Sequence, residues 1–351
     1  MTPPNISTMA GANVNINDRI TNHIREQAAA PIKYLEADFR IATNPISRPR
    51  LFEYYKTCRK MFWVPEEIDL SRDAGSFASM DANEQRFIEY ILAFFAQFDG
   101  LVNLNLAERF VEEVPIIEAR YFYQFQIMME NIHAETYSLM LETVVKDTAK
   151  RTELLNAIKT KPIIAKMAAW AYKWFSDDSE FGERLIGMGA VELIMFVAMF
   201  AAIYWVQKQG KLPGLGHANE LIARDETQHG LFAVAIYELL DDKPPVGVVQ
   251  DIIRECVELS KEFVNEALPY RLPEMNTELM GEYIECIADC YLTLLNVPKL
   301  YNRKNPFAFM ENINLLNKSL FFERRVSEYQ KLGTGRTAAG VENDDDEYED
   351  V

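Results

Sequence analysis

The stretch Glu130-Asn131-Ile132-His133 has a second copy of its pattern in Glu226-Thr227-Gln228-His229, so the chain carries Glu-x-x-His twice. Two further acids, Asp99 and Glu192, each lie inside an otherwise apolar stretch. Four carboxylates and two imidazoles are the ligand set of a two-metal site inside a helix bundle, where two helices give one acid each and two give Glu-x-x-His. We therefore predict an all-α fold, a helical bundle with a dinuclear metal site in its core.

The apolar residues around each predicted ligand recur every three or four positions, which is typical of the buried face of a helix. Phe95 and Val102 flank Asp99 in this way, and Ile222 and Ala233 flank the second Glu-x-x-His. A bare buried carboxylate is costly, and two divalent cations would neutralise four of them. One Glu-x-x-His alone would be a weak signal, but two copies and two isolated acids on inward faces are specific. The predicted metal ligands are Asp99, Glu130, His133, Glu192, Glu226 and His229. Oxygen and imidazole ligands suit iron or manganese.

Tyr137 follows His133 by four residues, which is one helical turn, so its phenol is expected on the same helix face as the ligands. A phenoxyl radical survives only where water and reductants are excluded, and an apolar pocket does this. A core aromatic residue without a redox role is the simpler interpretation of one tyrosine. The metal ligands beside it favour radical chemistry over metal storage.

The composition indicates a soluble protein with a large core, because 49% of the 351 residues are hydrophobic and 25% are charged. The net charge of −17 disfavours nucleic acid or an anionic membrane surface as partner. Between Leu185 and Val206 the only charge is Glu192, and this stretch is long enough to span a bilayer. It has no basic flank and no companion span, so we predict a buried core helix and no membrane partner.

The first residues show no secretory signal, and we expect a cytoplasmic protein. The four cysteines are expected to be buried, reduced thiols: Cys58, Cys256, Cys286 and Cys290.

Three parts are expected along the chain: a flexible N-terminus (1–14), a helical domain (15–332) and a flexible acidic tail (333–351). Asp81 with Glu84 three residues later predicts a capping box that opens a long helix. Later helices are expected at 115–147, 152–176, 180–209, 214–241, 247–268 and 276–297, with a stop at Gly210 and a restart near Pro213. The proline-containing segment 45–80 is expected to be mostly irregular.

Several longer motifs resemble one known family. Phe98-Asp99-Gly100-Leu101-Val102-Asn103, the run from Met129 to Ser138 and the run from Asn219 to Glu226 together resemble the small, radical-generating subunit of class I ribonucleotide reductase. Phe62-Trp63 followed by Glu66 to Ser71, and Leu212 to Leu215, resemble the same family. The resemblance runs from about residue 45 to 330 and implies a ferritin-like bundle with additional helices.

The resemblance also implies how the ligands divide. One metal ion would be bound by Asp99, Glu130 and His133, and the other by Glu192, Glu226 and His229, with shared carboxylates between them. The implied cofactor is two iron ions, joined by a bridging oxygen when oxidised, with manganese as the alternative.

The resemblance assigns further roles around the metal ions. Tyr137 would store the radical, in an apolar pocket of Phe196, Phe200 and Ile222. Trp63 and Asp225 would begin the path that carries an electron in and out, with Asp225 also bonding the far nitrogen of His133. Tyr329 would relay the radical to the large subunit.

The implied function is to activate an oxidant such as O2 and to generate and store a tyrosyl radical. A large subunit, bound through the C-terminal tail, would use this radical to reduce ribonucleoside diphosphates to deoxyribonucleoside diphosphates for DNA replication. A homodimer is implied as well. Three alternatives remain open at this point: a dimetal oxygenase or ligand-binding oxidase with its own substrate, a ferritin-like iron storage protein, and a metal-free helical scaffold.

Overall fold

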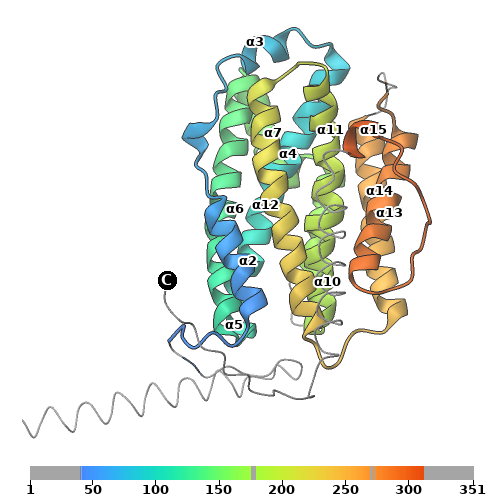
Figure 1. Cartoon of the computed structure of the whole chain (residues 1–351). Helices are drawn as coiled ribbons and strands as arrows, with labels where there is room; N and C mark the ends of the chain where they lie inside the picture. The colour runs from blue at the N-terminus through green and yellow to red at the C-terminus, as the bar shows by residue number, and fades with distance from the viewer. Residues whose placement is uncertain (1–39, 41, 175–178, 269–271, 273, 312–351) are drawn as a thin grey trace, which may run out of the picture. The chain divides into compact units, whose positions relative to one another are not determined.

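The computed structural model describes residues 40, 42–174, 179–268, 272 and 274–311, and these form a bundle of helices (Figure 1). Its β-structure, within those residues, is one isolated bridge between Leu272 and Met275. The predicted N-terminal segment 1–14 and acidic tail 333–351 lie outside the described residues. The predicted all-α class is therefore confirmed for the part of the chain that carries the expected ligands.

Long upright helical runs build the bundle core (Figure 1). They are α4 (Ala82–Asn105), α6 (Ile117–Val144), α12 (Pro213–Glu238) and one run made of α10 (Phe181–Ala190), the π-helical turn η3 (Val191–Met195) and α11 (Phe196–Lys208). Two more helices, α13 (Val246–Ala267) and α14 (Thr277–Leu294), pack against each other and against the α10–α11 run.

Shorter elements connect and cover these helices. They are α2 (Pro49–Lys60), η1 (Pro65–Glu67), α3 (Asp73–Ala78), η2 (Leu106–Phe110), α5 (Val111–Glu113), α7 (Thr148–Leu154), α8 (Ala157–Thr160), α9 (Pro162–Lys173) and α15 (Ala308–Glu311).

The predicted start and stop signals are present. The Asp81 side chain accepts hydrogen bonds from the backbone N–H groups of Asn83 (2.8 Å) and Glu84 (3.0 Å), and Glu84 Oε2 accepts from the Asp81 N–H (3.2 Å). This reciprocal pair fixes the first turn of α4. Gly210 has φ of +72°, a left-handed conformation that suits glycine, and α12 begins at Pro213.

Two predictions about helices were wrong, and proline explains the first and one of the two breaks in the second. The segment 45–80 is not mostly irregular, because α2 and α3 lie in it. Pro49 opens α2 at its first turn, where a missing N–H costs nothing. The expected single helix 152–176 is divided into parts of α7, α8 and α9. Pro162 ends the preceding helix, since its ring disfavours a helical residue before it, and starts α9.

Two helical runs are long and apolar enough to cross a membrane by composition, Ala82–Glu113 and Phe181–Lys208. The apolar window of the second run is entirely buried inside the bundle, and 67% of that of the first is buried. Both are therefore core helices of this fold, as predicted for the stretch around Glu192, but the expectation that this stretch has no companion of similar length and composition was wrong.

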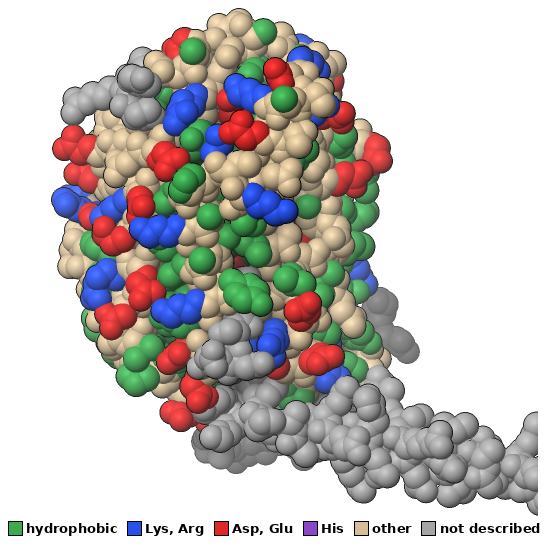
Figure 2. All heavy atoms as spheres, turned by 180° about the vertical axis from the view of Figure 1, so that it is seen from behind, with side chains coloured by type: hydrophobic (Ala, Val, Ile, Leu, Met, Phe, Trp, Pro, Cys, Tyr) green, Lys and Arg blue, Asp and Glu red, His purple; other side chains and the backbone are tan. Residues whose placement is uncertain are grey.

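Two surface features are visible in the space-filling and close-up views. On the face drawn in Figure 2, acidic and basic side chains are interspersed with hydrophobic ones, so this face offers no continuous basic surface to a polyanion.

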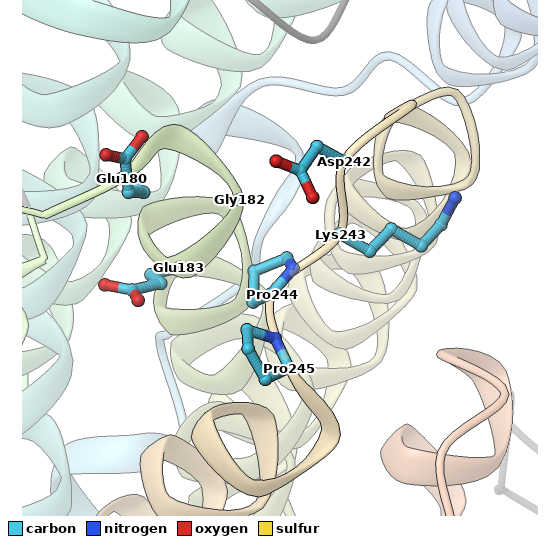
Figure 3. Close-up of a pocket in the computed structure, with 7 residues that line it drawn as sticks. All are labelled: Glu180, Gly182, Glu183, Asp242, Lys243, Pro244 and Pro245. Atoms are coloured by element: carbon cyan, nitrogen blue, oxygen red, sulfur yellow. The ribbon is translucent and has the colours of Figure 1, made fainter.

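A hollow between α10 and the loop before α13 is lined by Glu180, Gly182, Glu183 and residues 242–245 (Figure 3). A Cβ at Gly182 would lie 2.7 Å from Pro244 Cδ, so glycine permits this close approach.

A buried carboxylate fixes the start of α12, the helix that carries the second Glu-x-x-His. Asp73, on α3, accepts hydrogen bonds from the backbone N–H groups of Gly214 (2.9 Å) and Leu215 (2.7 Å). Helix N-termini leave such N–H groups without intrahelical partners, and a negative charge there is favourable.

We expect Asp73→Ala to lower the free energy of unfolding by about 1–2 kcal/mol, because two N–H groups at the start of α12 lose their acceptor. Urea unfolding followed by circular dichroism measures this, with the exposed Glu66→Ala as control. Equal unfolding midpoints for the two variants would show that Asp73 does not stabilise α12.

Candidate metal centre

Four helical runs bring the six predicted ligands into the bundle interior. Asp99 lies on α4, Glu130 and His133 on α6, Glu192 in η3, and Glu226 and His229 on α12. Each has an exposed fraction of 0–3%. The inward faces inferred from three- and four-residue spacing are thus the faces that the fold buries.

Four of these residues form one compact cluster. Glu130, Glu192, Glu226 and His229 each offer a ligand atom, and these atoms lie within 4.8 Å of one another. His229 Nδ1 is 3.0 Å from Glu130 Oε1 and 2.8 Å from Glu226 Oε2. Glu130 and Glu226 lie on different helices, so this imidazole joins α6 to α12 at the centre of the bundle.

His133 approaches the same two carboxylates from the other side. Its Nδ1 lies 2.8 Å from Glu226 Oε1 and 3.5 Å from Glu130 Oε2. Neither contact has hydrogen-bond geometry, since both His133 Nδ1 and Glu226 Oε1 are without a hydrogen-bond partner among the described residues. A lone pair on nitrogen and a carboxylate oxygen that face each other in this way are suited to sharing a cation.

Asp99 is the sixth predicted ligand, and it lies outside the four-residue cluster. Within the described residues, neither of its oxygens has a hydrogen-bond partner, although the side chain is fully buried. Burial raises the pKa of Asp99 well above its usual range, and the carboxylate of Glu130 raises it further. This electrostatic coupling indicates that Asp99 faces the cluster from α4.

The cluster attracts positive charge. Burial lowers the pKa of His229, but the carboxylates of Glu226 and Glu130 outweigh burial and raise it to about 9. Burial also opposes a charge on His133, and Glu226 again dominates and raises its pKa well above the usual range. Besides the two oxygens of Asp99, one oxygen each of Glu130, Glu192 and Glu226 is buried without a hydrogen-bond partner among the described residues. Hard oxygen donors that lack protein partners, beside imidazole nitrogens, fit a pair of divalent cations.

Glu192 owes its position to a local change in helix geometry. It lies in the π-helical turn η3, which interrupts an otherwise α-helical run between α10 and α11. Such a turn accommodates one additional residue and is frequent at functional sites. Burial raises the pKa of Glu192 well above its usual range, with the charge on Glu226 adding to the rise.

Sequence reasoning missed Gln126, which links two of the carboxylates. Its Nε2 lies 3.4 Å from Glu130 Oε1 and 3.3 Å from Glu192 Oε1, and the side chain is 2% exposed. The available signal was its position four residues before Glu130, on the same face of α6. A neutral amide donor between two carboxylates orients both without adding charge.

Tyr137 is fully buried one turn after His133, and its hydroxyl has no hydrogen-bond partner among the described residues. Its ring stacks on Phe95 with centroids 4.6 Å apart and planes at 2°. Phe95 in turn contacts Phe200 (5.0 Å) and Phe196 (5.4 Å). Phe95 was predicted on the inward face of its helix but not as a neighbour of Tyr137, because this contact joins α4 to α6. Ile222 is fully buried on α12.

Trp63, Asp225 and His133 form a buried chain. Trp63 Nε1 donates to Asp225 Oδ2 (2.7 Å), and the same oxygen lies 3.3 Å from His133 Nε2. The Trp63 ring also stacks on the His133 ring, with centroids 5.9 Å apart. Arg224 Nη2 lies 3.3 Å from Asp225 Oδ1 and donates to the Met61 carbonyl, which ties α12 to the end of α2. Tyr329, the predicted relay residue, lies outside the described residues.

The fold and the site define a class: a helical bundle whose interior carries a two-metal carboxylate and histidine cluster. Comparisons with known proteins then give the family. Residues 40–306 match the family model "Ribonucleotide reductase, small chain". The chain belongs to this family, so it is the small subunit of an oxidoreductase that works with a large subunit.

Individual relatives agree. The chain is 48% identical over 295 residues to the ribonucleoside-diphosphate reductase small chain of Spisula solidissima, which covers 84% of this chain and 77% of the relative. It is 47% identical over 294 residues to the small chain of Vaccinia virus (strain Ankara), covering 84% and 92%. The structure of the ribonucleotide reductase Rnr4 homodimer from Saccharomyces cerevisiae matches with a TM-score of 0.75 and 32% identity, covering 91% of this chain and 99% of that chain.

These matches confirm the predicted family, the ferritin-like fold and the prediction that the chain is a ribonucleotide reductase small subunit. They do not favour the oxygenase or iron-storage alternatives. Together with the buried cluster they indicate a dinuclear metal site. The assignment of individual ligands and of the radical and electron-transfer residues stays a prediction.

We expect Gln126→Leu to weaken metal binding about tenfold to a hundredfold, because Glu130 and Glu192 lose a shared orienting donor. The matched control is Gln124→Leu, an exposed glutamine two residues away on the same helix. Competition with a chelator of known affinity measures the binding constants. If both variants bind metal as tightly as the unmodified chain, Gln126 does not position the ligands.

Proposed function

We propose that this chain generates and stores a tyrosyl radical at Tyr137, and that the large subunit uses this radical to reduce ribonucleoside diphosphates to deoxyribonucleoside diphosphates. The observation that carries the proposal is the set of buried carboxylate oxygens without partners, one helical turn from a fully buried phenol. Family membership supports the reductase reaction.

We propose that Asp99, Glu130 and His133 bind one metal ion and that Glu192, Glu226 and His229 bind the other. In this arrangement the two carboxylates that both imidazoles contact, Glu130 and Glu226, are placed to be shared. Iron is the proposed metal, with manganese as the alternative, because hard oxygens and imidazoles suit both. When bound, the metal pair supplies the oxidising power, with O2 as oxidant, that removes one electron from the phenol.

Tyr137 is suited to holding the radical because its surroundings exclude water. Its ring has no exposed surface and stacks on Phe95, which itself lies against Phe196 and Phe200. Burial raises the pKa of Tyr137 well above its usual range, and the charge of Asp99 adds to this, so the resting phenol keeps its proton. Ile222 is proposed as a further wall of the pocket.

The chain of Trp63, Asp225 and His133 is proposed as the route for the electron between the surface side of the bundle and the metal centre. Asp225 Oδ2 contacts both the indole N–H and His133 Nε2, so one carboxylate oxygen holds both rings. This contact also fixes which nitrogen of His133 faces the carboxylates. Tyr329 is the proposed next relay toward the large subunit.

We also propose a homodimer, a large-subunit contact through the tail 333–351, and a location in the cytoplasm. The yeast Rnr4 relative is described as a homodimer. In this chain Leu104 on α4, and Met128 and Leu139 on α6, are 40–42% exposed, which gives these two helices an apolar outer surface that a second copy could cover.

We expect Tyr137→Phe to bind metal normally but to give no tyrosyl signal in electron paramagnetic resonance after anaerobic iron loading and exposure to air. The change removes the oxidisable phenol hydroxyl of Tyr137 and keeps the packing on Phe95. The control is Tyr123→Phe, a buried tyrosine on the same helix. An unchanged radical signal in the Tyr137 variant would exclude Tyr137 as the radical site, and elemental analysis of the loaded protein identifies the metal.

We expect Trp63→Phe to keep the Tyr137 radical but to lower turnover with the large subunit about a hundredfold or more, since the indole N–H that bonds Asp225 is lost. Trp174→Phe, a buried tryptophan on another part of the bundle, is the control. Normal turnover of the Trp63 variant would remove Trp63 from the route.

We expect a chain truncated after Tyr329 to form the radical normally and to lose turnover, because the proposed large-subunit contact is absent. The measurement pairs the radical signal with reductase activity in the presence of the large subunit. Full activity of the truncated chain would contradict the proposed role of the tail.

A further inference from the structure

The cysteines differ from one another in a way that the sequence analysis did not predict. Cys58 and Cys256 are buried as expected, but Cys286 and Cys290 are only half-buried, so that part of the prediction was wrong. Both lie on α14 four residues apart, which places them one turn apart on one face of the helix. They form a pair of thiols that solvent can reach, outside the carboxylate cluster.

The two thiols are hydrogen-bonded to each other. The pKa of Cys286 is lowered chiefly by the hydrogen bond from Cys290; burial and the charge of Asp289 oppose this, and the ammonium of Lys299 adds a smaller lowering. The pKa of Cys290 is raised by the same bond. The two sulfurs therefore lie within hydrogen-bonding distance of each other, and Cys286 is the one whose proton is held less tightly.

Helix geometry disfavours a disulfide between them. Residues four apart on a helix have Cβ atoms about 5–6 Å apart. A disulfide requires about 3.5–4.5 Å between its Cβ atoms. An ion bound by both sulfurs relieves this mismatch, because two metal–sulfur bonds of about 2.3 Å span up to about 4.6 Å between the sulfurs. The pair is thus better suited to holding an ion than to oxidation.

The acids beside the thiols are already engaged. Asp289 Oδ1 accepts hydrogen bonds from the backbone N–H groups of Leu300 (2.9 Å) and Tyr301 (3.1 Å). Its other oxygen accepts one from the backbone N–H of Asn302 (2.5 Å). Glu285 pairs with Lys261 (2.8 Å) and Arg303 (2.7 Å). With these oxygens occupied, the site offers sulfur alone, which selects soft cations and not the hard cations that the bundle core suits.

We propose that Cys286 and Cys290 form a second metal site, which binds one soft, thiophilic cation such as Cu(I). Two thiols bind Cu(I) with the loss of two protons, which leaves a complex with one net negative charge beside Lys299. No electron is transferred, since copper enters and stays in the +1 state. The helix supplies both ligands without rearrangement of the backbone.

The experiment uses the full-length, iron-loaded protein, so that the carboxylate cluster is already occupied. Anaerobic Cu(I) is titrated in competition with a Cu(I)-selective chelator. One Cu(I) per chain is expected, and Cys286→Ser and Cys290→Ser should each weaken its binding at least a hundredfold. The matched control is Cys256→Ser, which changes a fully buried thiol and should leave the affinity unchanged.

A second measurement needs no variant. One equivalent of Cu(I) should protect two thiols of the unmodified protein, Cys286 and Cys290, from alkylation, as located by peptide mass spectrometry. Copper retained by both serine variants, alkylation unaffected by copper, or ready formation of a Cys286–Cys290 disulfide under mild oxidation would each overturn the proposal.

Discussion

The burial of four carboxylates in one apolar interior is the constraint on which the rest of this structure depends. Each buried charge costs several kcal/mol, whereas a whole domain is stable by only about 5–15 kcal/mol. Asp99, Glu130, Glu192 and Glu226 are fully buried, so the bundle requires positive charge at its centre. The carboxylates also raise the pKa of both imidazoles, His133 and His229, because they favour a positive charge on each ring. A pair of divalent cations meets it, and binding them then stabilises the fold.

His133 connects this electrostatic centre to the rest of the protein. Its Nδ1 faces Glu226 at 2.8 Å, and its Nε2 lies 3.3 Å from Asp225, which also accepts from Trp63. One ring therefore contacts both the metal cluster and the chain of residues that leads away from it. Tyr137, one turn further along α6, has an apolar environment instead. The same helix thus places the proposed polar route for electrons on one side of His133 and the apolar surroundings proposed for the radical one turn further on.

The sequence predicted those features that depend on spacing within one helix. The inward positions of Asp99, Glu192 and the two Glu-x-x-His pairs followed from periodicity, and the Asp81 capping box followed from two residues three apart. Features that join different helices were not predictable in this way. Phe95 reaches Tyr137 across the contact of α4 with α6, and Gln126 reaches Glu192 across to η3. The segment that contains Pro49 was predicted to be irregular, and the helix predicted for 152–176 ran through Pro162, although proline ends one helix and opens the next.

The metal-binding atoms of the core cluster and those of the α14 cysteine pair differ in chemical hardness. The core presents oxygens and imidazoles whose partners are missing, while around Cys286 and Cys290 the acids Asp289 and Glu285 are bonded to backbone amides and basic side chains. Burial raises the pKa of Cys256, so the interior thiol next to the bundle core stays protonated and does not compete as a ligand. Among the described residues, the compact group of oxygen and imidazole ligands lies inside the bundle, whereas the sulfur pair proposed for a soft cation lies on α14. If both proposed sites are occupied, the chemistry of the donor atoms alone separates the two kinds of metal ion within one helical fold.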